Sequence, residues 1–348
     1  MAKTRISQLK ALADIISDYR AGSIPPRDSN LINDWLGQFP AVEQEPLLDA
    51  LVHVLQKTYI SKTDFKTFLE ALASTDKLSP GSDPKTYWKS VNLLNIQKGG
   101  RSQREILSTF DEVLKTTHGF GTQETGSVGG HYVYLDDCVG TGSRVRADVC
   151  TWLESDAPKS IELHIITPVL YVGSYWIDQK IQETATAHGK TITLHKWRLD
   201  QFQMENRLAR RNTSDVLWPT ELPTDPAVQA YAVQLQNSGH PAILRDPGNV
   251  GASGIFQDDA QKMLLEQAFL RRGCQIRQEC SNLPDKARPL GYHNLDCLGF
   301  GSMFVTYRNC PNNCPLALWV QQAEYPALFP RKTNTQTAIQ NLVAELNQ

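Results

Sequence analysis

The sequence lacks any apolar run near the roughly 20 residues that a membrane-spanning helix requires. Its first residues, Met1 to Arg5, lack the apolar core of a signal peptide. The formal net charge at pH 7 is only −2, so no global excess of positive charge points to nucleic acid. Internal repeats and low-complexity tracts are absent as well. These absences predict a globular cytoplasmic protein that works without a membrane.

Seven cysteines are scattered along the chain, at positions 138, 150, 274, 280, 297, 310 and 314. The odd number argues against a complete disulfide framework. Neither Cys310 with Cys314 nor Cys274 with Cys280 has the two-residue gap of the common zinc-binding motifs. We therefore expect buried free thiols rather than a structural zinc site.

The chain divides into segments of different character. Apolar residues at helical spacing predict short amphipathic helices from the N-terminus to about residue 75, with Trp35 and Phe39 anchoring a small core. The segment from Ser79 to Pro84 is rich in Pro, Gly and Ser and indicates a domain boundary. We expect a helical domain over residues 1–80, a larger domain over 86–332, and a C-terminal helix or tail over 333–348.

After residue 86, strand-like segments alternate with single helices. Strands are predicted at Val91–Ile96, Tyr132–Leu135, Ile161–Val169 and Thr191–Trp197, and helices at 103–115, up to about 155, and at 175–188. This order predicts an α/β fold with a mainly parallel sheet.

The C-terminal third is less regular. Asp258 is expected to cap a helix that stops at Gly273. Its predicted apolar side carries Ala260, Met263, Leu264 and Ala268. A strand is expected from Cys297 to Tyr307.

The segment from Tyr132 to Ser143 carries the clearest chemistry. An apolar strand ends in Asp136 and Asp137, then turns through Gly140 and Gly142 into a helix. Ligands of open α/β sheets bind at the carboxyl ends of the strands, and free amides at a helix N-terminus favour phosphate. The predicted cradle comprises Cys138, Val139, Gly140, Thr141, Gly142 and Ser143.

Asp136 and Asp137 would lie one sugar's width from this phosphate. Their carboxylates can accept hydrogen bonds from two vicinal hydroxyls and help to hold a hydrated Mg²⁺ ion, which makes them the candidate catalytic and metal-binding residues. The alternative is an acid pair that merely caps a helix after a core strand. A catalytic thiolate at Cys138 is not expected, because neighbouring carboxylates raise a thiol pKa.

This segment resembles the signature of phosphoribosyltransferases, in which four apolar residues precede two acids and a Thr-Gly turn. One departure is Arg144, which stands where those enzymes usually carry Thr. In the type I phosphoribosyltransferase fold, the loop after the first strand contacts pyrophosphate. The corresponding residues here are Lys98, Gly99, Gly100, Arg101, Ser102 and Gln103. Glycines and cations before a helix suit a polyphosphate, although such a loop alone is equally typical of an ordinary surface.

A narrower resemblance extends from about residue 30 to 332. The chain is similar to the phosphoribosyltransferase-like domain of bacterial conflict and antiphage systems, including retrons. The shared features beyond the acid pair are Trp35, Gln38-Phe39, Gly100 to Gln103, Leu290-Gly291-Tyr292, Asn309 to Asn313, Trp319 and Leu328 to Arg331. Cys310 replaces the usual Thr of that family. The resemblance implies a type I phosphoribosyltransferase-like sheet flanked by helices, with a small helical N-terminal domain.

The loop at Asn312 and Asn313 has two interpretations. Asn side chains bond their own backbone and tolerate left-handed conformations, so a structural turn is one of them. The other is that both side chains reach over the ligand and recognise a base or a second phosphate, together with Tyr292, His293 or Arg308.

Three functions remain open at this point. The first is an effector that binds phosphoribosyl pyrophosphate or a nucleotide and transfers or cleaves a ribosyl group. The second is a non-catalytic sensor in the same kind of system. The resemblance implies as partners a reverse transcriptase–DNA/RNA complex and a DNA-binding protein. The third and weakest is nucleic-acid binding through the clusters Arg207, Arg210, Arg211 and Arg271, Arg272.

Overall fold

The structure is a computed structural model that describes residues 4–98, 102–280, 282–295 and 297–331. The chain forms two compact units, one of residues 62–204 and the other of residues 1–61 with 205–348. This grouping by packing is drawn differently from the predicted division at residue 80, which stays a prediction. In the described part of the chain, no helix is both long and apolar enough to cross a membrane.

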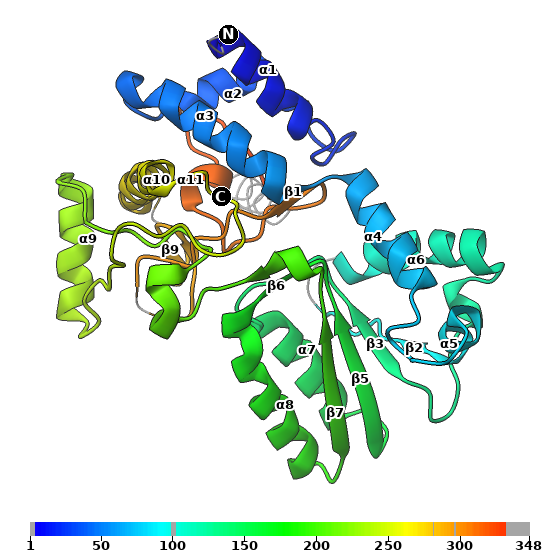
Figure 1. Ribbon diagram of the computed structural model, residues 1–348. Helices are drawn as coiled ribbons and strands as arrows, with labels where there is room; N and C mark the ends of the chain where they lie inside the picture. The colour runs from blue at the N-terminus through cyan, green and yellow to red at the C-terminus, as the bar shows by residue number, and fades with distance from the viewer. Residues whose placement is uncertain (1–3, 99–101, 281, 296, 332–348) are drawn as a thin grey trace, which may run out of the picture. The chain divides into compact units, whose positions relative to one another are not determined.

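The unit of residues 62–204 alternates helices with parallel strands (Figure 1). One sheet has the strand order β2-β3-β5-β7 and a second the order β4-β6-β8. The predicted α/β class with a mainly parallel sheet is therefore confirmed. The elements are α4 (Lys62–Ser74), α5 (Pro84–Ser90), β2 (Asn92–Leu93), α6 (Ser102–His118), η1 (Thr122–Glu124), β3 (Tyr132–Leu135), β4 (Cys138–Val139), α7 (Ser143–Glu154), β5 (Ser160–Ile166), β6 (Val169–Tyr171), η2 (Val172–Tyr175), α8 (Trp176–Ala187), β7 (Thr191–Trp197), η3 (Asp200–Phe202) and β8 (Gln203–Met204).

The two sheets are continuations of the same chain segments across a break. Asp136 and Asp137 separate β3 from β4, and Thr167 and Pro168 separate β5 from β6. The pairing carries on across the break, because the Asp136 amide donates to Ile166 O at 3.1 Å. Pro168 has no N–H to offer a neighbouring strand. The single strand predicted from Ile161 to Val169 is therefore interrupted.

Helices α7 and α8 cover one face of the larger sheet (Figure 1). Ile161, Leu163 and Ile165 of β5 point to this face and share a buried core with Ile177 and Ile181 of α8. Side chains alternate along a strand, so Glu162 and His164 occupy the opposite face.

The other unit is mainly helical. Trp35 is fully buried there and donates its indole N–H to Ala317 O at 2.8 Å, while its ring packs edge-on against Phe39. Strands β1 and β11 pair in parallel, and β9 and β10 are antiparallel. The elements are α1 (Arg5–Ile15), α2 (Ser29–Leu36), α3 (Ala41–Thr58), β1 (Tyr59–Ile60), η4 (Leu208–Thr213), α9 (Pro226–Asn237), α10 (Asp259–Glu279), β9 (Ala287–Arg288), β10 (Gly291–Tyr292), β11 (Val305–Thr306) and α11 (Leu316–Trp319).

Two predictions for this unit are wrong. Asp258 does cap α10, since it accepts from the Gln261 amide at 2.8 Å, but the helix runs past Gly273 to Glu279. A Cβ on Gly273 would lie 2.4 Å from Pro289 O, so glycine serves close approach of backbone here and not helix termination. The buried side of α10 also differs, because Lys262 and Glu266 are fully buried. Of the strand expected over 297–307, only Val305–Thr306 is a strand.

The close approach at Gly273 makes a direct prediction. Gly273→Ala should lower the free energy of unfolding by about 1–3 kcal/mol, since overpacking against backbone outweighs the better helix propensity of alanine. Urea denaturation of the full chain measures this change. The exposed Gln236→Ala in α9 is the control, with an expected effect within about 0.5 kcal/mol. Equal stability of the Gly273 variant and the native protein would contradict the explanation.

Candidate functional site

The turn between β4 and α7 requires glycine at position 142. Gly142 is the N-cap of α7 and has a φ of 77°, in the left-handed region. A Cβ there would lie 2.7 Å from Ile177 Cγ2. The Gly142 carbonyl accepts from the Arg146 amide at 2.9 Å and so opens the helix. The predicted turn into a helix is thus fixed both by conformation and by packing against α8.

The amides of this turn are available to a ligand. Within the described residues, the N–H groups of Thr141 and Gly142 have no hydrogen-bond partner. The Thr141 hydroxyl donates to Ser143 Oγ at 3.2 Å and accepts from the Ser143 amide at a long 3.4 Å. Free amides at a helix N-terminus form an anion-binding site. The turn therefore has the donors that a phosphate needs.

Asp136 and Asp137 differ in their surroundings. Asp136 is buried, with 6% of its surface exposed, and its Oδ1 accepts from the Asp137 amide at 2.9 Å. Asp137 is half-buried. Adjacent carboxylates, one buried and one half-buried, are hard oxygen ligands that suit a partly hydrated Mg²⁺. Of the two, Asp137 has the freer access to a sugar or an ion.

A buried acid on α7 connects three parts of the site. Asp148, 4% exposed, accepts from the Tyr134 hydroxyl of β3 at 2.9 Å and from the backbone N–H of Lys98. Burial raises the pKa of Asp148, while the Tyr134 bond and the charge of Arg144 act in the opposite direction. This acid ties the strand before the acid pair to the start of the first loop.

Sequence reasoning missed Asp148. The signal was present, because Val145, Val149 and Trp152 surround it at helical spacing on the buried side of α7. A lone acid on an apolar helix face needs a buried partner.

The first loop is described in part. Gly99, Gly100 and Arg101 lie outside the described residues, and Ser102 begins α6. Gln103 is fully buried, and its Oε1 accepts from the amides of Ile96 at 2.8 Å and Gln97 at 3.0 Å. Gln103 therefore braces the loop from within. Its contact with a ligand, like that of Lys98 and Ser102, stays a prediction.

Asn312 and Asn313 belong to the other unit. The Asn313 side chain donates to Tyr292 O at 2.8 Å, and the Asn312 carbonyl accepts from the Tyr292 amide at 2.6 Å. Gly291 has a φ of 108° at this contact, and a Cβ on it would meet Asn313 O at 2.2 Å. The structural interpretation of the loop thus has direct support, and the ligand role stays a prediction. None of the seven cysteines forms a disulfide, and Cys274, Cys310 and Cys314 are buried.

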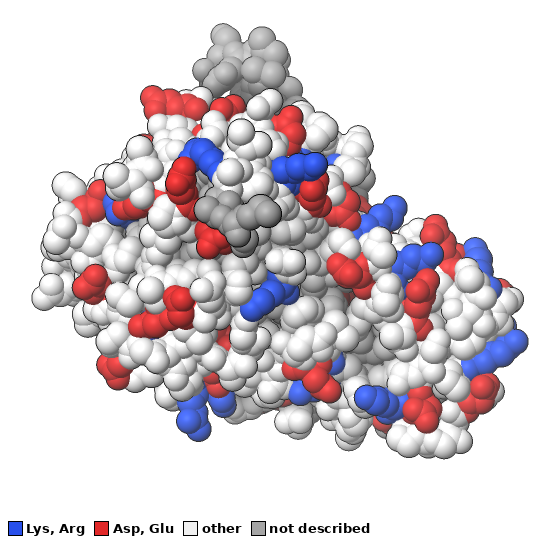
Figure 2. All heavy atoms as spheres, turned by 45° about the horizontal axis from the view of Figure 1, so that its top comes forward, with Lys and Arg blue, Asp and Glu red and all other residues white. Residues whose placement is uncertain are grey.

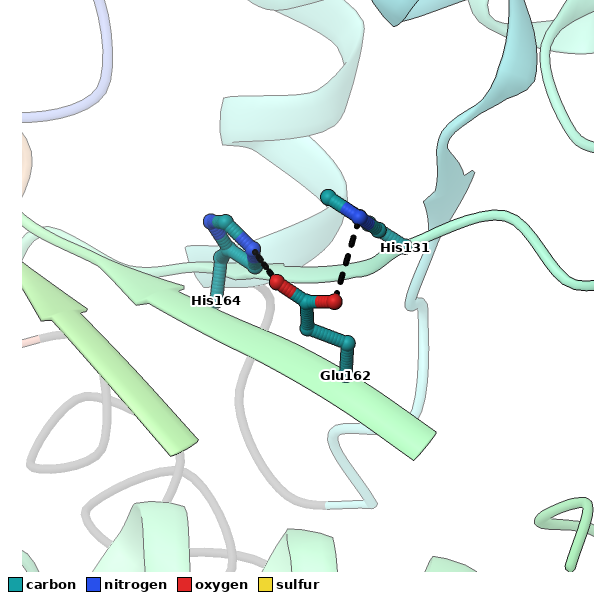
Figure 3. Close-up of side chains that lie close together, drawn as sticks. All are labelled: His131, Glu162 and His164. Carbon is teal, nitrogen blue, oxygen red and sulfur yellow. Dashed lines mark ion pairs between the residues drawn. The ribbon is translucent and has the colours of Figure 1, made fainter. Parts of the chain in front are cut away.

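Three histidines surround Glu162 on the sheet face opposite α7 and α8. Glu162 Oε2 lies 3.2 Å from His131 Nε2, and its Oε1 lies 3.5 Å from His164 Nε2 (Figure 3). The same Oε1 lies 3.2 Å from His195 Nε2. The histidine cluster, as we call these four residues, lies away from the acid pair, which follows the carboxyl end of β3. Sequence reasoning missed it, because the residues come from separate strands.

His131, Glu162 and His164 have the residue types of a metal centre, and their ligand atoms lie within 4.8 Å of one another. The protonation of the His164 ring argues against metal binding at this position. Trp197 Nε1 donates to His164 Nδ1 at 3.0 Å, so the proton of the neutral ring is on Nε2, the atom that would bind the metal. Metal-binding histidines instead donate from the other ring nitrogen. The histidine cluster is better described as a set of close polar contacts around Glu162, in which the neutral His164 ring is fixed by its hydrogen bond from Trp197.

The parallel sheet, its helical layers and the acid-pair turn define a phosphoribosyltransferase-like domain. The chain matches the PRTase-CE family over residues 32–331. It therefore belongs to the PRTase-CE family. No curated protein and no solved structure gives a significant match.

The histidine cluster predicts a loss of stability in acid. Burial first, then the charges of His195 and His131, lower the pKa of His164 to about 4. As the pH is lowered, His164 of the unfolded chain binds a proton near pH 6.5, whereas His164 of the folded chain stays neutral down to about pH 4. The free energy of unfolding therefore falls as the pH drops from about 6.5 to about 4. The loss from His164 is roughly 1–3 kcal/mol.

His164→Gln keeps an acceptor for Trp197 and removes the titrating ring. Its unfolding free energy, measured by denaturation from pH 7 to pH 4, should fall less steeply than that of the native protein. The carboxylates titrate in both proteins, so the comparison isolates His164. Parallel pH profiles would refute this assignment.

Proposed function

We propose that the protein is an enzyme that binds a ligand containing ribose 5-phosphate and transfers or cleaves its ribosyl group. The proposal rests mainly on the order of the acid pair and the turn amides after the carboxyl end of β3. An acid pair directly follows β3, and the amides of Thr141 and Gly142, just before α7, have no hydrogen-bond partner in the described part of the chain. Membership of the PRTase-CE family supports the same ligand class.

The proposed roles of the site residues follow from the charges that develop when the bond to the anomeric carbon breaks. Departure of pyrophosphate or a base from the anomeric carbon leaves positive charge on the sugar, so the enzyme's task is positioning and electrostatic stabilisation. Asp137, with Asp136 behind it, holds the sugar hydroxyls, and the amides and hydroxyls from Gly140 to Ser143 hold the phosphate. Lys98 lies at the loop proposed to face the leaving group. Mg²⁺ bound at the acid pair supplies positive charge that neutralises a phosphate leaving group.

The biological setting is a further part of the proposal. We infer an effector of a bacterial antiphage system of the retron type that acts in the cytoplasm. Its partners there are a reverse transcriptase–DNA/RNA complex and a DNA-binding protein. This inference rests on the resemblance of the chain to such effectors and not on the chemistry of the site.

Binding through the two arginine clusters has less support. Arg207 pairs with Glu205, Arg271 with Glu43 and Arg272 with Glu279, and Arg211 donates to Leu244 O. Figure 2 shows acidic and basic side chains mixed over the visible face. Cations already paired with acids contribute little to a phosphate-binding surface.

The acid pair is tested by replacing both carboxylates with amides. Asp136→Asn with Asp137→Asn should weaken the binding of phosphoribosyl pyrophosphate at least about ten-fold, because hydrogen bonds to charged groups contribute about 1.5–3 kcal/mol. Isothermal titration calorimetry with Mg²⁺ present measures the affinity, and the variant should also lose defence in cells. The control is Asp156→Asn, which alters an exposed acid of the same unit. Unchanged affinity in the double variant would exclude the acid pair from the site.

The competing sensor function makes the opposite prediction for turnover. With saturating phosphoribosyl pyrophosphate or nucleotides, an enzyme should release pyrophosphate or free base, measured by a coupled assay and by mass spectrometry. The double variant of the acid pair is the control for background hydrolysis. Tight binding without any product would favour the sensor.

A further inference from the structure

Two strongly exposed aromatic residues lie beside the phosphate cradle. Tyr175 and Trp176 are 41% and 44% exposed, whereas every other Phe, Tyr and Trp in the described part of the chain is buried or half-buried. The Trp176 indole donates its N–H to Thr141 O at 2.9 Å. This bond attaches a flat apolar surface directly to the turn that begins α7.

Cations accompany these rings. The Arg146 guanidinium lies 5.7 Å from the centre of the Trp176 ring. Lys196 Nζ lies 4.2 Å from the centre of the Tyr175 ring, but its side chain is 7% exposed and pairs with Asp178 at 2.6 Å, so Arg146 and not Lys196 is the cation offered to a ligand. Arg144 is exposed, and the first turn of α7 has no acid. Positive side chains are unfavourable at a helix N-terminus, which is already the positive end of the dipole. Their presence suits a ligand with more negative charge than one phosphate.

Exposed rings beside cations are the means by which proteins bind single-stranded nucleic acid. Bases stack on the rings, and the cations follow the backbone phosphates. A nucleoside monophosphate or phosphoribosyl pyrophosphate ends at its 5′-phosphate, so beyond that phosphate it has no group to place on Trp176. A polynucleotide continues beyond that phosphate to the preceding nucleoside.

The acid pair restricts which nucleotide of a strand can enter. Two carboxylates that clasp vicinal hydroxyls need a ribose whose 2′ and 3′ hydroxyls are both free. Deoxyribose lacks the first, and an internal ribonucleotide has its 3′ oxygen in a phosphodiester. Only the last nucleotide of an RNA strand offers the vicinal pair together with a 5′ phosphodiester.

We propose that the site binds the 3′ end of a single-stranded RNA, with the last phosphodiester in the cradle and the penultimate base stacked on Trp176. The terminal ribose lies against Asp137, and Arg146 faces the next phosphate of the strand. This proposal rests on the proposed function and names its substrate class.

The test uses the full-length protein and a fluorescein-labelled eight-nucleotide RNA in an anisotropy assay. The native protein should bind the RNA with a free 3′ end at least about ten-fold more tightly than the same RNA with a 3′-phosphate, or than the corresponding DNA. Ribose 5-phosphate should compete for the site.

Two substitutions of Trp176 distinguish stacking of its ring on a base from structural support of the turn through its bond to Thr141. Trp176→Ala should weaken RNA binding about ten-fold, and Trp176→Phe, which keeps a ring but loses the bond to Thr141, should stay within about three-fold of the native affinity. Arg146→Ala should weaken RNA binding and reduce its salt dependence. Lys159→Ala, at an exposed cation elsewhere in the unit, is the control and should change nothing.

The outcomes distinguish failure of the RNA 3′-end proposal from failure of the proposed function on which it rests. If ribose 5-phosphate binds while all three oligonucleotides bind equally, the RNA 3′ end is wrong and the proposed function stands. If Trp176→Phe is as weak as Trp176→Ala, the indole only braces the turn and the stacking role is wrong. If neither ribose 5-phosphate nor RNA binds, the cradle itself is wrong and both proposals fall.

Discussion

The left-handed turn at Gly142 is the constraint on which the site depends. It lets the chain leave β4 and enter α7 within a few residues, and it presses the turn against Ile177 of α8. A side chain at this position would be strained by the backbone and would also collide with its neighbour. Because the turn is held this closely, the amides of Thr141 and Gly142 are fixed in place, and they have no hydrogen-bond partner among the residues that the structure describes. A bound anion would supply the acceptor that the protein does not provide for these two amides.

The interrupted sheet places the acids beside those amides. β3 ends at Leu135, and the chain rejoins a ladder at Cys138, so the acid pair occupies a gap between two sets of backbone hydrogen bonds. Asp148 supports the arrangement from α7 through Tyr134 and the Lys98 backbone. Under the proposed function, sugar, phosphate and leaving group are bound by three chain segments, and Asp148 of α7 links these segments.

Local patterns in the sequence predicted the parts of the fold that depend on neighbouring residues. The acid-pair turn could be predicted because its strand, glycines and helix are contiguous, and the parallel order followed from alternating strands and helices. The extent of α10 could not, because the reason for Gly273 is Pro289, a residue outside the helix. The histidine cluster also could not be predicted, because it depends on contacts between residues far apart in the sequence. Its members come together only when β3, β5 and β7 pair. The burial of Asp148 could have been predicted from the helical spacing of its apolar neighbours. Its role could not, because that depends on the hydrogen bond from Tyr134.

The most direct test of the central claim is the environment of the turn amides. In a ¹⁵N-labelled sample with Mg²⁺, addition of ribose 5-phosphate should move the amide protons of Thr141 and Gly142 strongly downfield, as charge-assisted hydrogen bonds to phosphate require. Shifts confined to other parts of the chain, with these two amides unmoved at saturation, would contradict the account.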